Sequence, residues 1–187
     1  MSRVIHVFRQ PERFVAGTVG EPGDRSFYLQ AIEEARTISV LLEKQQVSVL
    51  AERISALLTE VARRFGSDVP DGAGGDVDPL AVPLEEEFRV GTMGLGWDSD
   101  SKSIVVELLA VTEEEIDESV VLDDTDEGPD ALRVFLTPEQ AKAFAERAEK
   151  VVSAGRAPCP LCAEPLDPEG HVCVRLNGYH PRSPVGE

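Results

Sequence analysis

Apolar residues recur at helical spacing between residues 44 and 65, and this pattern constrains the fold more than any other feature of the chain. Charged residues fall between the apolar ones, so one face of the predicted helix is apolar and the opposite face is polar. Gly66 follows directly and is a natural stop, because glycine adopts the left-handed conformation of a helix C-terminus without steric cost. The helix has to bury its apolar face against another element. That face consists of Val47, Leu50, Ile54, Leu57, Leu58, Val61 and Phe65.

A second helix is predicted over residues 138–154. Thr137 is a suitable capping residue, Pro138 suits the first turn, and Gln140 can complete a capping box. Gly155 ends this helix in the same way as Gly66 ends the first. Its apolar stripe consists of Ala141, Phe144, Ala145, Ala148, Val151 and Val152.

Short β-like runs precede each helix, and turn residues rich in proline and glycine separate several of them. Because short turns join neighbouring strands as hairpins, the spacing predicts antiparallel meanders. The run 91–96 is rich in glycine but lies inside a strand pattern, which predicts a bulged or closely packed strand and not a dinucleotide loop. The predicted strands cover residues 4–8, 14–19, 26–32, 36–43, 87–97, 103–112 and 131–136.

Strands followed by a helix therefore occur twice, over residues 3–66 and 86–154. We predict an α+β body over residues 1–154, in which two helices pack against a largely antiparallel sheet. The segment 67–83, rich in Gly, Asp and Pro, would connect the two halves. The alternative of two independent small sheets is less favoured, because each sheet would leave an apolar face to cover.

The net charge of −17 argues against duplex nucleic acid and anionic lipid as partners, since both are polyanions. The body accounts for this charge, because residues 1–154 carry 15 Lys and Arg against 31 Asp and Glu. Solubility and the choice of a basic protein partner both remain explanations. Residues 113–130 contain ten acids and no base, so we expect a solvated segment, with a short strand possible at residues 120–122.

No stretch approaches the roughly 20 consecutive apolar residues of a membrane span, and the opening residues lack the apolar region of a signal peptide. These observations predict a cytoplasmic protein.

Four side chains able to bind a metal fall within residues 159–173, in the spacing Cys159-x2-Cys162-x8-His171-x-Cys173. Thiolate and imidazole ligands favour zinc over magnesium or calcium. We therefore predict that residues 155–187 form a zinc-binding tail. Four protein ligands leave no position for water, which makes the site structural. Without the metal, residues 156–182 would be disordered, because their few apolar residues cannot form a core.

Other interpretations of this motif stay open. The three cysteines of the chain could be reduced and unligated, or Cys159 and Cys162 could form a redox pair. His180 or a solvent molecule could take the place of His171.

Five segments of the chain form a recognisable combination. They are Arg3-Val4-Ile5-His6-Val7-Phe8, Phe135-Leu136-Thr137-Pro138-Glu139-Gln140-Ala141, Cys159-Pro160-Leu161-Cys162, Gly170-His171-Val172-Cys173 and Asn177-Gly178-Tyr179.

With these segments the chain resembles an actinobacterial family of conserved hypothetical proteins of unknown function. The resemblance implies a shared pathway with a histidine-phosphatase-like and a phosphatidylinositol-kinase-like protein, whose genes tend to lie nearby. Ala163 stands where such knuckles commonly carry glycine, and His180 stands where the family suggests arginine. The second departure favours His171 as the ligand.

Two functions follow as hypotheses. The first is a non-catalytic adaptor whose zinc-stabilised tail docks a partner protein. The second is an enzyme or binding protein for a phosphorylated small molecule, with a pocket lined by Arg3, Arg9, Arg13 and Arg25. Surface pairing of these arginines with Glu12, Glu21 and Asp24 is the simpler explanation of their presence, and His6 is expected to be a half-buried spacer.

Overall fold

The computed structural model describes residues 2–21, 23–66, 76–154 and 161. Residues 1–19 and 26–152 belong to one compact unit, and residues 20–25 and 153–187 to a second. The described residues contain one seven-stranded sheet in the order β1-β7-β6-β5-β4-β3-β2. The strands are β1 (Ile5–Phe8), β2 (Arg13–Glu21), β3 (Asp24–Glu33), β4 (Arg36–Leu42), β5 (Glu86–Asp98), β6 (Ser103–Ala110) and β7 (Ala131–Leu136).

The sheet is mixed, so the prediction of a largely antiparallel sheet was wrong. Strand β1 pairs in parallel with β7, and β4 pairs in parallel with β5. The pairs β3–β4 and β5–β6 are antiparallel, as the hairpin spacing predicted, and β6–β7 is antiparallel across a longer connection. The parallel β4–β5 pair arises because a helix connects the end of one strand to the beginning of the other, and such a crossover brings the second strand back in the same direction.

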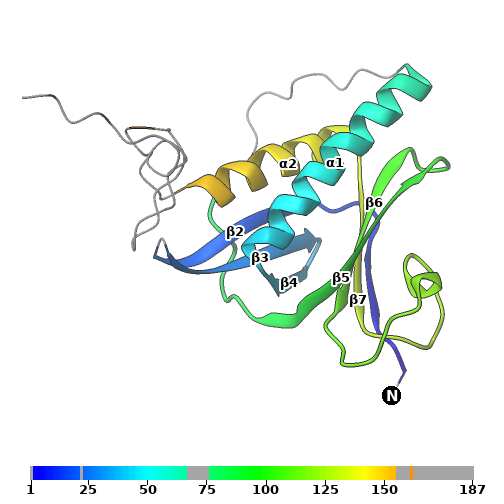
Figure 1. Cartoon of the computed structure of the whole chain (residues 1–187), viewed down its shortest axis with the longest axis horizontal. Helices are drawn as coiled ribbons and strands as arrows, with labels where there is room; N and C mark the ends of the chain where they lie inside the picture. Colours follow the sequence, from blue (N-terminus) through cyan, green and yellow to red (C-terminus); the bar gives the residue numbers. More distant parts are fainter. Residues whose placement is uncertain (1, 22, 67–75, 155–160, 162–187) are drawn as a thin grey trace, which may run out of the picture. The chain divides into compact units, whose positions relative to one another are not determined.

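Strand β5 joins the two halves of the chain into one sheet. Its first residues pair with β4, with Arg89 opposite Leu41, and its residues from Val90 to Asp98 pair with β6. The alternative of two independent sheets is therefore excluded as well. The sheet is strongly curved, so that β2 and β3 run across the direction of β5, β6 and β7 (Figure 1).

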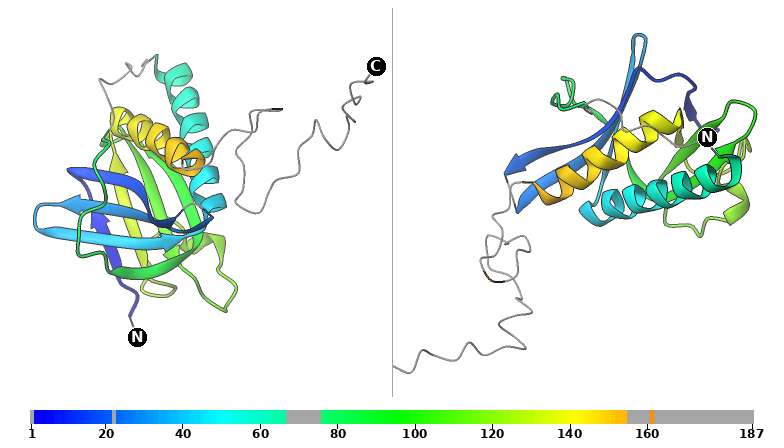
Figure 2. Two further views of the ribbon diagram at one scale, coloured as in Figure 1. Left: turned by 90° about the vertical axis from the view of Figure 1, so that its left-hand side faces the viewer. Right: turned by 90° about the horizontal axis from the view of Figure 1, so that it is seen from above.

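Both predicted helices are present, as α1 (Lys44–Phe65) and α2 (Pro138–Ser153). They lie side by side over one face of the sheet (Figures 1 and 2). Gly66 has a φ of 65° and ends α1, and Thr137 and Gln140 form the predicted capping box of α2. Among the described residues, no helix combines the length and the apolar character that a membrane crossing requires.

One apolar core lies between the helices and the sheet. Leu50 and Ile54 of α1 and Phe144 of α2 are almost completely buried in it, and the Phe144 ring stacks on Phe14 with 4.7 Å between the ring centroids. Of the predicted α1 stripe, Phe65 is the exception, since it is 59% exposed. The other residues of the stripe belong to this core or pack against it, with the exception of Val61. That side chain is buried but is not part of the core cluster.

The glycine-rich run is both bulged and closely packed, as predicted. The pairing of β5 with β6 shifts by one residue at Gly91. A Cβ atom on Gly94 would lie 2.2 Å from Val121 Cγ1, and one on Gly96 would lie 3.1 Å from Leu122 Cδ1. Strand β5 therefore needs glycine where the segment before β7 crosses it.

The segment between β6 and β7 differs in part from its prediction. Its acidic side chains are exposed, as expected for a solvated run. In place of the possible short strand at residues 120–122, a 3₁₀ helix, η1 (Glu118–Val120), is followed by Leu122 with a φ of 63°. We call residues 111–130 the acidic loop.

Substitution of Gly94 by alanine is expected to destabilise the protein by about 1–3 kcal/mol, because the added methyl group overlaps a stiff valine side chain. Urea unfolding followed by circular dichroism measures this. Gly96→Ala is the matched control and should cost less, since the flexible end of Leu122 can move. Equal unfolding midpoints for wild type and Gly94→Ala would contradict the close packing of the acidic loop.

Candidate functional site

The predicted zinc ligands Cys159, Cys162, His171 and Cys173 lie outside the described residues, and so does His180. Within the described segments, no group of three or more His, Cys, Asp or Glu side chains is placed to hold a metal ion. The zinc site therefore stays a prediction.

A cluster of buried charges lies on the face of the sheet away from the helices. Glu107 of β6 is opposite Arg133 of β7, and both are buried. Arg133 donates from Nη2 and Nε to Glu107 Oε1, at 2.8 and 3.1 Å. Arg3 Nη2 lies 3.7 Å from the same oxygen. Two arginines thus share one carboxylate, which compensates part of their charge.

The buried cluster holds the acidic loop by its backbone. Arg3 donates from Nε to the carbonyl oxygen of Pro129 at 2.8 Å, and from Nη1 to those of Asp123 and Thr125 at 3.1 and 3.4 Å. Arg3 was predicted to line a phosphate pocket, but its guanidinium is used to fix this loop.

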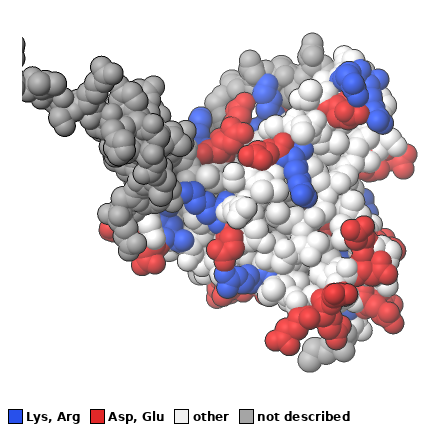
Figure 3. All heavy atoms as spheres, in the orientation of Figure 1, with Lys and Arg blue, Asp and Glu red and all other residues white. Residues whose placement is uncertain are grey.

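Arg133 and Glu107 complete the attachment. Arg133 donates to the carbonyl oxygen of Asp123 at 2.9 Å and to the carboxylate of Asp124, and the backbone N–H of Leu122 donates to Glu107. The hydrogen bond from Arg133 holds the pKa of the Asp124 carboxyl below its usual value. The acidic side chains of the loop face solvent, and they gather at the lower right of Figure 3, where Figure 1 shows the loop between β6 and β7.

Beside this cluster the sheet is hollowed, with a volume of about 620 Å³. We call this feature the outer hollow. Its floor follows one row across the sheet, in which Val105 lies opposite both Phe135 and Gly96. The residues that line it are Arg9, Gly96, Trp97, Asp98, Asp100, Ser101, Val105, Leu122, Asp124, Arg133 and Phe135.

Charges of both signs line the outer hollow. The Arg9 guanidinium lies 4.8 Å from the centroid of the Phe135 ring. Hydrogen bonds, above all from the Ser101 hydroxyl, lower the pKa of Asp98, and the positive charge of Arg9 adds to this effect. Arg9 likewise adds to the lowering of the pKa of Asp124. Arg9 is therefore close enough to both carboxylates to stabilise their ionised forms.

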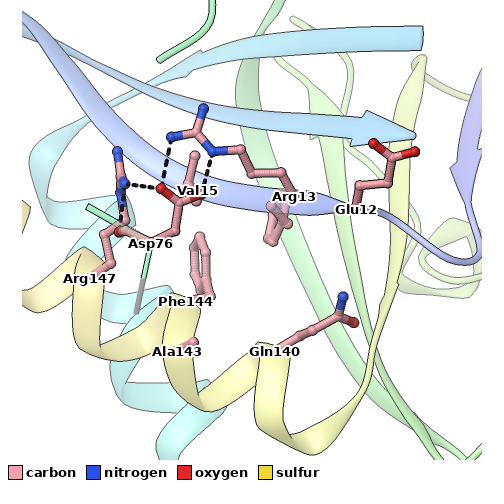
Figure 4. A pocket seen from close by; sticks show the side chains of 9 residues that line it. Glu12, Arg13, Val15, Asp76, Gln140, Ala143, Phe144 and Arg147 are labelled. Atoms are coloured by element: carbon pink, nitrogen blue, oxygen red, sulfur yellow. Dashed lines mark hydrogen bonds and ion pairs between the residues drawn. The ribbon is translucent and has the colours of Figure 1, made fainter. Parts of the chain in front are cut away.

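A second, smaller pocket of about 150 Å³ lies between β2 and α2 (Figure 4). Arg13 and Arg147 both point at the carboxylate of Asp76 there. Arg13 donates from Nε and Nη2 to this carboxylate, and Arg147 Nη1 lies 3.2 Å from Asp76 Oδ1. Arg147 also donates from Nε to the carbonyl oxygen of Ala16 at 2.8 Å, which covers part of the open edge of the sheet.

These arginines hold a segment of chain, residues 76–85, across the outer face of the sheet. Arg13 Nη2 donates to the carbonyl oxygens of Asp78 and Pro79, at 2.7 and 2.9 Å. The buried Gln30 side chain exchanges hydrogen bonds with the N–H and the carbonyl oxygen of Ala81, at 2.8 and 3.1 Å. We call residues 76–85 the strap.

Arg3, Arg9 and Arg13 of the predicted phosphate pocket are not brought together. Arg3 is in the buried cluster, Arg9 in the outer hollow and Arg13 in the pocket of Figure 4, while Arg25 belongs to the second unit. The carboxylates that pair with Arg3 and Arg13 are Glu107 and Asp76, and neither was among the predicted partners.

His6 is half-buried, as expected. Its Nε2 atom lies 3.3 Å from Glu87 Oε1.

Sequence reasoning missed Glu107, Arg133, Asp76 and Arg147. A signal for the first two was present, since each is a single charged residue within an otherwise apolar strand. Asp76 and Arg147 carry no such signal, because they lie in a polar segment and on a helix with many charges.

The described part of the chain is thus a mixed α+β body with charged clusters that hold two surface segments in place. The chain belongs to a family of proteins of unknown function, DUF3090, whose model matches residues 6–173. The matched range includes Cys159, Cys162, His171 and Cys173. Comparison with the curated proteins and with the solved structures gives no match.

The Asp76 carboxylate is expected to make stability depend on pH. Hydrogen bonds from Arg13 lower its folded-state pKa below the ordinary 3.8. Its stabilising effect is therefore complete above the unfolded-state pKa and is lost as the pH falls through the folded-state pKa. Asp76→Asn should lower the free energy of unfolding by about 1–2 kcal/mol at pH 7, and the difference from wild type should shrink below pH ~4.

Urea unfolding at pH 7 and at several lower pH values measures this effect. Asp100→Asn removes an acid from an exposed turn and serves as control, with little expected change at pH 7. A constant difference between wild type and Asp76→Asn down to pH ~3 would contradict the role assigned to the carboxylate.

Proposed function

We propose that this protein is a non-catalytic interaction protein that docks a basic segment of a partner protein and carries a zinc-stabilised tail. The observation that carries the proposal is the fixed shape of the acidic loop, whose backbone is held by Arg3, Glu107 and Arg133. A loop that served solubility alone would need no such attachment.

The energetic argument concerns the buried charges. Burial of ionised side chains is unfavourable unless hydrogen bonds and opposite charges compensate it. Here Arg3 and Arg133 direct their hydrogen bonds to Glu107 and to the acidic loop. The loop must therefore keep this conformation for the buried charges to stay compensated. A loop ordered before binding loses less conformational entropy when a partner docks.

The charge of the loop indicates the class of partner. Ten acids and no base lie within residues 113–130, and those side chains are exposed. A surface of one sign raises the association rate with a surface of the opposite sign and disfavours partners of like charge. A basic protein segment fits this surface best.

The tail completes the proposal. Cys159, Cys162, His171 and Cys173 would hold zinc with a closed set of four ligands, which suits a structural role. The family match extends to the last of them.

Tagged protein from its native cell is expected to retain a partner through the acidic loop. Asp126→Asn/Glu127→Gln should weaken the retained complex several-fold at about 0.15 M salt, as measured with the purified pair. Glu52→Gln/Glu146→Gln makes the same change in charge on the exposed surface of the helices and should have little effect. Reproducible absence of a partner, or equal weakening by both variants, would contradict the proposal.

Purified protein is expected to contain about one zinc ion per chain. Metal analysis after gentle preparation should show loss of zinc in Cys162→Ser and in His171→Gln, while His180→Gln should retain it. A zinc content well below one per chain that Cys162→Ser leaves unchanged would reject the site. If His171→Gln kept its zinc and His180→Gln lost it, His180 and not His171 would be the fourth ligand.

A further inference from the structure

We propose that the outer hollow is a receptor site for an arginine side chain of the partner protein and that Arg9 occupies this site in the free protein. This inference rests on the proposed function and adds the place and the chemistry of recognition. Three observations carry it: an aromatic floor already covered by a guanidinium, carboxylates held in position around it, and a hollow large enough for a side chain.

The floor is shown to accept a guanidinium. Arg9 lies 4.8 Å from the Phe135 ring centroid, within the roughly 6 Å range of favourable cation–π contacts. Among the residues that the structure describes, the Arg9 guanidinium has no hydrogen-bond or ion-pair partner. Its displacement by another arginine therefore breaks no hydrogen bond, and the incoming guanidinium takes over both the ring contact and the attraction to Asp98 and Asp124.

The carboxylates around the floor are fixed in position. Asp98 accepts hydrogen bonds from the backbone N–H groups of Asp100 and Ser101 and from the Ser101 hydroxyl, so the turn holds it. Arg133 holds Asp124 on the opposite side, although the Asp124 side chain is 85% exposed and open to a further donor. An incoming guanidinium thus meets oriented acceptors.

The balance of charge favours a cation over an anion. Two positive charges line the outer hollow, those of Arg9 and Arg133, against the three negative charges of Asp98, Asp100 and Asp124. Beneath it, the buried Arg3 and Glu107 balance each other. A phosphate would face these three carboxylates and the acidic loop. A guanidinium that replaced Arg9 over Phe135 would be attracted by them. Arginine fits better than lysine, because its planar group stacks on a ring and donates to two carboxylates together.

Isothermal titration calorimetry measures binding here, because the single tryptophan, Trp97, stacks its ring on Phe65 of α1 and so lies on the helix side of the sheet. The probe is the capped tripeptide acetyl-Gly-Arg-Gly-amide, and its citrulline analogue is the neutral control. The arginine probe is expected to bind wild type with a Kd at least ten times lower than the citrulline probe. Arg9→Gln should lower the Kd of the arginine probe about threefold or more, since it vacates the ring.

Two variants separate a site from general attraction between charges. Phe135→Leu leaves the net charge unchanged and should raise the Kd about threefold or more, whereas Asp100→Asn should weaken binding more than Glu52→Gln does. Equal binding of the arginine and citrulline probes, or an unchanged Kd in Arg9→Gln, would overturn the site. Thermal unfolding shows whether Phe135→Leu is folded. If it is not folded, the Kd values of Arg9→Gln and Asp100→Asn test the site.

These experiments distinguish failure of the arginine site from failure of the proposed function. A partner that binds through the acidic loop but is indifferent to Phe135→Leu and Asp100→Asn would refute the arginine site and leave the interaction role standing. Selective binding of the arginine probe without any partner in the cell would support the arginine site and refute the interaction role.

Discussion

Glu107 is completely buried, and two arginines from distant parts of the chain share its carboxylate. This ion cluster ties the N-terminal strand, the centre of the sheet and the acidic loop to one another. Removal of one charge would leave the others buried without compensation, which is strongly unfavourable. The position of the acidic loop, the packing of Val121 on Gly94 and the wall of the outer hollow all depend on this arrangement.

A second set of polar contacts solves a different problem. The connection from α1 to β5 has to pass from the helix layer to the sheet, and the strap at its end is held by Arg13, Arg147 and Gln30. Arg147 also covers a carbonyl oxygen of the edge strand β2. Charged side chains in this fold thus serve to attach irregular segments, and the acids that remain on the surface are available for a partner.

Prediction succeeded where the signal was local. The helices, the capping box of Thr137 and Gln140 and the close packing at Gly94 follow from residues within a few positions of one another. It failed for the parallel pairs and for the partners of the arginines. Arg3 binds the carbonyl oxygen of Pro129, 126 positions away, and no local pattern indicates such a contact.

The amino-acid sequence by itself determined the secondary structure elements, the acidity of the body and the spacing of four metal-binding side chains near the C-terminus, because each depends on residue type and short spacing. The tertiary structure decided that β1 pairs with β7, that Glu107 joins Arg3 to Arg133, and that Arg9 covers Phe135 beside a hollow. The physical reason is that several strand orders satisfy the same local pattern. Burial of one common core and compensation of the buried charges select among them.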